Sequence, residues 1–254
     1  MKGAPILFTS KLLKLIYPTK CAICGENIEI KATQMQEFTC NNCKLKLEYI
    51  RDDYVVKKAY GKYFDYICSP YFYEKEIRNL ILGFKFSNKK YLCDFLSQEL
   101  IIILSKFKTT KIDYVIYVPI SIKRYFKRGY NQSSLLAKRI SQSLEIPIAK
   151  YLLIKIKNNK TQSNLNMAQR HTNPKGAYRV VLKSILKDKN VLLVDDIYTT
   201  GSTLNECSKV LKEAGVKTII AVTSAKAKLG FDTYIRWGGS LKSGWISWKH
   251  FRLH

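Results

Sequence analysis

One stretch of the chain, Val191 to Thr203, limits the possible folds more than any other. It reads VLLVDDIYTTGST. Its four leading apolar residues predict a short strand of the buried parallel kind. Two aspartates, a small polar loop and a helix over residues 204–214 follow, and residues 218–222 predict the next strand. This strand–loop–helix–strand unit is typical of an α/β protein with a mainly parallel sheet, helices on both faces and a ligand at the carboxyl ends of the strands.

The residues after the predicted strand suit a phosphorylated sugar. The loop consists of small or hydroxyl-bearing residues, Thr199, Thr200, Gly201, Ser202 and Thr203. A helix N-terminus with such hydroxyls favours a phosphate, and Gly201 lets the backbone approach it closely. The carboxylates of Asp195 and Asp196 cannot bind the phosphate that this loop favours, but they suit sugar hydroxyls or Mg²⁺. We therefore predict a ribose-phosphate site. The alternative is an acidic turn before a helix capped by Thr203 and Glu206.

Four of the seven cysteines form two CxxC pairs near the start of the chain, Cys21 with Cys24 and Cys40 with Cys43. This spacing allows four thiolates to surround Zn²⁺ tetrahedrally. Because four cysteines fill the coordination shell, the predicted zinc is structural, and its loss should unfold the unit. The alternative is a pair of coincidental or redox CxxC sequences. We place the zinc ribbon at residues 15–50.

A basic stretch follows the predicted strand at residues 113–118. It reads ISIKRYFKRGYNQ over residues 120–132 and contains Lys123, Arg124, Lys127 and Arg128. We expect a loop here that holds pyrophosphate or nucleic acid, whereas the alternative is a solvated run of charge. Upstream, apolar spacing predicts helices over residues 74–85 and 90–104.

Residues 152–178 contain many amide side chains and few large apolar residues after Ile156. This composition predicts either a flap that excludes water from the site or a plain surface loop. If the chain catalyses group transfer, Arg124, Arg128 and the flap residue Lys160 are candidates for stabilising a leaving pyrophosphate.

The formal net charge of the chain is +25, with a pI of about 9.7. Such a charge favours polyanionic partners such as nucleic acid, although lysines scattered by proteome bias would give the same total. No apolar run approaches the length of a membrane helix, and no apolar core of a secretion signal follows Lys2. We therefore expect a cytoplasmic protein without a membrane span.

The order of these motifs resembles that of the ComF family, competence proteins with a zinc ribbon and a type I phosphoribosyltransferase-like domain. The resemblance covers roughly residues 15–226, and its most specific parts are the RGYNQ sequence at 128–132, the QSNLNMAQRHTNPKGAY sequence at 162–178 and the central motif. It implies that Asp195 and Asp196 contact the ribose hydroxyls of 5-phosphoribosyl-1-pyrophosphate (PRPP), that residues 199–203 hold its 5′-phosphate, and that Mg²⁺ accompanies the ligand. It also implies a role in natural transformation, with single-stranded DNA and uptake helicases or recombination proteins as partners.

The sequence departs from the family pattern at several positions. Asn159 stands where a threonine is usual, and Lys155 and Lys157 stand where arginine is common. We assign residues 60–226 to the phosphoribosyltransferase-like domain. Residues 227–254 form a basic extension with all three tryptophans, which is either a DNA-stacking tail or, as we favour, a non-native segment without function.

Three functions are compatible with these features. The first is a PRPP-binding accessory protein of DNA uptake. The second is an active Mg²⁺-dependent phosphoribosyltransferase, for which no nucleobase pocket is evident and the nitrogenous acceptor is open. The third is a PRPP-sensing regulator, which needs no catalytic flap.

Overall fold

The computed structural model describes residues 20–28, 38–47, 49–50, 57–106, 110–157 and 175–228. Lys160, most of the predicted flap and the tail from residue 229 onward lie outside the described residues. Within the described part, no helix is long and apolar enough to cross a membrane.

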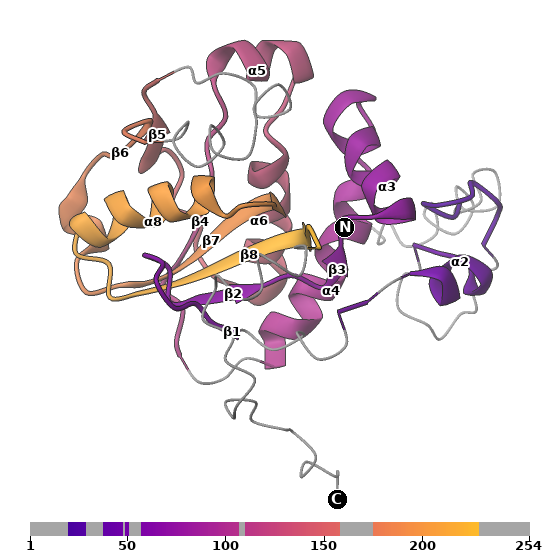
Figure 1. Ribbon diagram of the computed structural model, residues 1–254, viewed down its shortest axis with the longest axis horizontal. Coiled ribbons are helices and arrows are strands. Elements are labelled where there is room, and N and C mark those ends of the chain that lie inside the picture. Colours follow the sequence, from indigo (N-terminus) through magenta and orange to yellow (C-terminus); the bar gives the residue numbers. More distant parts are fainter. Residues whose placement is uncertain are drawn as a thin grey trace, which may run out of the picture.

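A mainly parallel sheet forms the centre of the described structure (Figure 1). Its strands occur in the order β1 (Lys57–Lys58), β2 (Tyr66–Cys68), β8 (Thr218–Lys226), β7 (Asn190–Tyr198) and β4 (Tyr114–Tyr117), and β3 (Tyr71–Phe72) pairs with the far end of β8. Only the pairing of β1 with β2 is antiparallel in this sheet. The predicted α/β class with a parallel sheet is therefore confirmed.

Helices cover both faces of the sheet. One face packs against α3 (Lys75–Phe86), α4 (Leu92–Lys106) and α6 (Gln132–Leu144). The other packs against α8 (Ser202–Glu213), the antiparallel pair β5 (Leu153–Lys155) and β6 (Tyr178–Val180), and the 3₁₀ turn η2 (Lys183–Leu186). The short helix α5 (Ile122–Arg128) lies near the ends of the strands, and α2 (Asn41–Lys46) belongs to the N-terminal unit (Figure 1).

Alternate side chains of β7 explain this layering. Leu192 and Val194 join the core beneath α3, α4 and α6, whereas Val191 and Leu193 join the core beneath α8. All four side chains are fully buried. A strand covered on both faces needs a continuous apolar run, and this is the pattern that the sequence shows.

Three local predictions were wrong. Strand β7 continues past Val194 to Tyr198, because it stays paired with β8 up to Lys226, so the acidic pair lies within the strand. The basic stretch expected to be a loop contains α5, which begins after a cap from Ser121 and ends at Gly129 with φ of 75°. Helix α8 begins at Ser202, so Thr203 is no cap.

The cap residue of α8 is Gly201, which offers no side chain. Glu206, expected to close the capping box, instead accepts a hydrogen bond from the Gly176 N–H at 2.6 Å. The carboxylate thus joins α8 to the segment that leads into β6.

Candidate functional site

A pocket of about 150 Å³ opens at the carboxyl ends of β4 and β7. Six of the residues predicted for sugar-phosphate binding line it, namely Asp195, Asp196, Thr199, Gly201, Ser202 and Thr203, and so do Arg124 and Arg128. Thr200 belongs to the same loop, where its hydroxyl lies 2.8 Å from that of Ser202. Lys123 and Lys127 do not line the pocket, and both are exposed. The fold therefore joins the acidic pair and half of the basic stretch in one site.

The two aspartates have different surroundings. Asp195 Oδ1 accepts hydrogen bonds from the Ser133 hydroxyl at 2.8 Å and from the Asp196 N–H at 2.9 Å. Burial, and next the charge of Asp196, raises the pKa of Asp195 to about 7. Asp196 forms an ion pair with Lys85 Nζ at 3.0 Å, and both side chains are largely buried. The Asp195 carboxyl therefore changes protonation near neutral pH.

The loop between β7 and α8 also lines the pocket. Gly201 has φ of +71°, and a Cβ at this position would lie 2.5 Å from the Tyr198 hydroxyl oxygen. Only glycine fits both constraints. The loop thus ends at the N-terminus of a twelve-residue helix, where the helix dipole and the hydroxyls of Thr199, Ser202 and Thr203 favour an anion.

Cations from three separate elements face the pocket. Lys85 comes from α3, Arg124 and Arg128 from α5, and Lys155 from β5. Arg128 is held in place because its Nη1 donates to Gln132 Oε1 at 3.0 Å and its guanidinium stacks on the Phe86 ring, with 4.9 Å between the guanidinium carbon and the ring centroid. The positive charge of these four side chains would balance the negative charge of a dianionic or more highly charged ligand.

Lys155 and Tyr178 form a linked pair at the edge of the pocket. Lys155 Nζ donates to the Tyr178 hydroxyl at 3.3 Å. Burial, and then the charge of Arg124, lowers the pKa of Lys155, while burial raises that of Tyr178. They lie on β5 and β6, the paired strands found at the two ends of the segment 152–178 that was predicted to be a flap.

Sequence reasoning missed Lys85, Ser133, Lys155 and Tyr178 as site residues. The RGYNQ sequence held a usable signal, because it positions two of the elements involved. The Tyr130 hydroxyl donates to the Phe84 carbonyl on α3, and Asn131 Nδ2 donates to the Val118 carbonyl at 3.0 Å. Asn131 also caps α6 by accepting from the Ser133 N–H at 3.1 Å.

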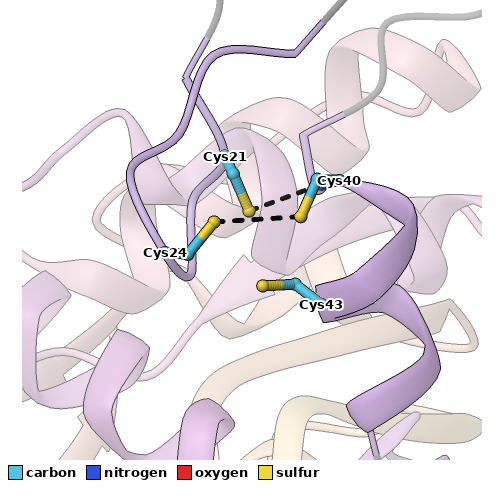
Figure 2. Close-up of side chains that lie close together, drawn as sticks. All are labelled: Cys21, Cys24, Cys40 and Cys43. Atoms are coloured by element: carbon cyan, nitrogen blue, oxygen red, sulfur yellow. Dashed lines mark hydrogen bonds between the residues drawn. The ribbon is translucent and has the colours of Figure 1, made fainter.

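The four cysteines of the CxxC pairs meet in one cluster (Figure 2). Their sulfur atoms all lie within 4.8 Å of one another. The Cys24 and Cys40 sulfurs are 3.8 Å apart, and the Cys40 N–H donates to the Cys21 sulfur at 3.4 Å. A tetrahedron with Zn–S bonds of about 2.3 Å requires sulfur separations of about 3.8 Å. The donor set and its spacing therefore fit a zinc ion.

Comparisons with known proteins agree with this architecture. The phosphoribosyl transferase domain model matches residues 131–232. Competence protein F of Haemophilus influenzae is 34% identical over 204 residues, which cover 78% of this chain and 81% of that protein. A DNA utilization protein of Escherichia coli K12 is 30% identical over 58% of this chain and 66% of its own length. Competence protein ComFC of Bacillus subtilis is 25% identical over 80% of this chain and 75% of its own length.

Among solved structures, a purine phosphoribosyltransferase from Pyrococcus horikoshii is 22% identical, with a TM-score of 0.34, over 52% of this chain and 72% of that one. The similarity to competence protein F, the matched phosphoribosyl transferase domain and the cysteine cluster together show the family. The chain belongs to the ComF family of competence proteins, which combine a phosphoribosyltransferase domain with an N-terminal four-cysteine cluster.

Proposed function

We propose that this protein binds PRPP together with Mg²⁺ in the pocket at the ends of β4 and β7, and that it acts in natural transformation by handling incoming single-stranded DNA. The observation that carries the proposal is that one pocket combines an acidic pair, an anion-binding loop and four cations. Asp195 and Asp196 line it together with loop residues 199 and 201–203, and Lys85, Arg124, Arg128 and Lys155 contribute positive charge.

Each part of the ligand has a matching group of residues. The loop of residues 199–203 at the start of α8 suits the 5′-phosphate. Asp195 and Asp196 suit the two ribose hydroxyls, which donate to carboxylates. Arg124 and Arg128 line the pocket and suit the pyrophosphate, since a guanidinium group can form two parallel hydrogen bonds to phosphate oxygens. Mg²⁺, held by phosphate oxygens near the acidic pair, would neutralise part of the pyrophosphate charge.

The role in DNA handling is supported by the relatives and by charge. Two of the similar proteins bear the name competence protein and one is named for DNA utilization. The net charge of +25 favours a polyanion. We further propose that Cys21, Cys24, Cys40 and Cys43 bind a structural Zn²⁺.

A second function, phosphoribosyl transfer, is favoured by one specific feature. Arg124 and Arg128 line the same pocket as the acidic pair, and their positive charge would stabilise a departing pyrophosphate. Release of pyrophosphate from PRPP in the presence of a nitrogenous acceptor would establish this activity.

Titration calorimetry with PRPP, with and without Mg²⁺, tests the proposed site. We expect Mg²⁺-assisted binding by the wild type and none by Asp195→Ala/Asp196→Ala. Asp188→Asn, at an exposed turn just before the first residue of β7 and so at the other end of that strand from the pocket loop, is the matched control and should bind normally. If folded, zinc-loaded wild type does not bind PRPP, the proposed site is wrong.

A further inference from the structure

Helix α5 presents three chemically distinct faces. Arg124 and Arg128, one turn apart, line the pocket. Lys123 and Lys127, also one turn apart, are exposed. The third face carries Ile122, Tyr125 and Phe126, which follow the i, i+3, i+4 spacing of one helix side.

The third face is apolar and open to solvent. Phe126 is 80% exposed, Ile122 is 74% exposed, and no residue of α5 is buried. The rings of Tyr125 and Phe126 are 6.3 Å apart, nearly perpendicular to each other. Grouped aromatic side chains that do not contribute to a core mark an interaction site.

The segment that ends α3 lies beside α5 and carries more exposed rings and lysines. Phe86 and Tyr91 are both exposed, and Lys89 and Lys90 lie between them in sequence and are also exposed. Arg128 of α5 stacks on the Phe86 ring, so the two segments are in contact. Figure 1 shows α3 and α5 extending to the same end of the molecule.

We define the α5–α3 surface by its exposed rings and cations: Ile122, Tyr125, Phe126, Phe86, Tyr91, Lys123, Lys127, Lys89 and Lys90. Neither residues 84–91 nor residues 119–132 contain an aspartate or glutamate. The surface therefore combines flat apolar rings with positive charge and has no carboxylate of its own to repel an anion.

We propose that the α5–α3 surface binds single-stranded DNA, with bases stacked on Tyr125, Phe126 and their neighbours and with phosphates beside the lysines. This inference rests on the DNA-handling part of the proposed function and locates it. It also divides the basic stretch into two roles, because Arg124 and Arg128 serve the pocket while Lys123 and Lys127 serve the nucleic acid.

The chemistry favours single strands over other partners. Unpaired bases offer flat faces that stack on aromatic side chains in any sequence, whereas a duplex hides these faces and would use only the lysines. The alternation of basic and aromatic residues in IKRYFKR suits a strand that alternates phosphate and base. An acidic protein could bind the lysines by charge alone, so the exposed aromatic rings favour single-stranded DNA as the partner.

Fluorescence anisotropy with a labelled oligothymidylate tests the surface. Tyr125→Ala/Phe126→Ala should weaken binding by at least about 5-fold, since each stacked base contributes that much or more. Tyr60→Ala is the matched control, because Tyr60 is 75% exposed in the turn between β1 and β2. Binding to a duplex of the same length should not change in the aromatic variant.

The lysines make a separate, quantitative prediction. Lys123→Gln/Lys127→Gln should reduce the slope of log affinity against log salt by about 1.4, or about 0.7 for each phosphate contact to a single strand. Lys183→Gln/Lys217→Gln removes two exposed lysines elsewhere and should leave the slope much less affected. The aromatic variant should lose affinity with little change in slope.

Calorimetry with PRPP on the same variants separates this inference from the pocket proposal. Tyr125 and Phe126 do not line the pocket, so their replacement should leave PRPP binding unchanged. Wild type that binds the oligonucleotide but not PRPP would refute the pocket and keep the surface. Wild type that does not bind the oligonucleotide, or an aromatic variant that binds it normally, would overturn the surface; in the latter case the rings serve a protein or membrane contact.

Discussion

Replacing Asp195 with asparagine should stabilise the protein at alkaline pH while abolishing PRPP binding. The pKa of this carboxyl is raised from 3.8 to about 7 by burial and by the charge of Asp196. Between pH 3.8 and about 7, the Asp195 carboxyl therefore keeps its proton in the native state but has lost it in the unfolded chain. As pH rises through this window, ionisation of Asp195 increasingly favours the unfolded state, and an asparagine escapes this cost.

The magnitude follows from the two pKa values. Because one pKa unit corresponds to about 1.4 kcal/mol, the cost is up to roughly 1.5 kcal/mol at pH 5 and roughly 4 kcal/mol at pH 8. The asparagine Oδ1 can still accept the hydrogen bonds from Ser133 and from the Asp196 N–H. Relative to wild type, the gain in the free energy of unfolding of Asp195→Asn should thus be between about 2 and 3 kcal/mol larger at pH 8 than at pH 5.

Urea denaturation at pH 5 and pH 8, in zinc-containing buffer without Mg²⁺, measures this difference. Asp188→Asn is the control, because Asp188 is exposed and has a left-handed backbone with φ of 59° that asparagine tolerates. Its effect on the free energy of unfolding should be small, because the side chain is exposed. The reasoning is refuted if Asp195→Asn is no more stable than wild type at pH 8, or if its gain is equal at both pH values.

Three further outcomes are expected. Gly201→Ala should lower the free energy of unfolding by about 1–3 kcal/mol and weaken PRPP binding, because its Cβ would collide with the Tyr198 ring at a positive φ; unchanged urea curves would contradict this. Lys85→Met removes a charge that lowers the pKa of Asp195, so the pH midpoint of PRPP binding should rise, whereas an unchanged or lower midpoint would count against the ion pair. Zinc removal by a chelator should expose the four cluster thiols to a thiol reagent together with a fall in melting temperature; thiols that react equally before chelation would exclude a bound metal.

The sequence predicted those parts of the fold that depend on local pattern. Three structures follow from residues that are close in sequence: strand β7 from its apolar run, helix α3 from its apolar spacing, and the cysteine cluster from its two CxxC pairs. The end of β7 was misplaced because two charges suggested a loop, whereas pairing with β8 keeps the strand regular to Tyr198. Helix α5 was missed because none of its residues is buried and it therefore has no core-facing periodicity.

The sequence pointed to the acidic pair, the loop of residues 199–203 and the arginines of the basic stretch as site residues, but not to Lys85 or Lys155. Asp195 and the loop of residues 199–203 are close in sequence, so the sequence alone indicates that they lie in the same site. Lys85 and Lys155 reach the same pocket from segments about 110 and 40 residues away from Asp196, through the packing of α3 and the β5–β6 pair. The RGYNQ sequence gives an indirect signal for Lys85, because the Tyr130 hydroxyl donates to the neighbouring Phe84 carbonyl on α3, but no such motif points to Lys155.

The strand order also constrains how the chain folds as it leaves the ribosome. Strand β2 pairs on its parallel side with β8, from Tyr66 opposite Ile220 to Cys68 opposite Val222, and β4 pairs with β7. At about 5–20 residues per second, roughly 150 residues and about 8–30 s separate the synthesis of β2 from that of its partner. The cysteine cluster needs only residues 21–43 and can close long before the sheet does. Nascent chains should therefore hold an ordered cysteine cluster ahead of an unfinished sheet, whose apolar strands stay exposed until β7 and β8 emerge.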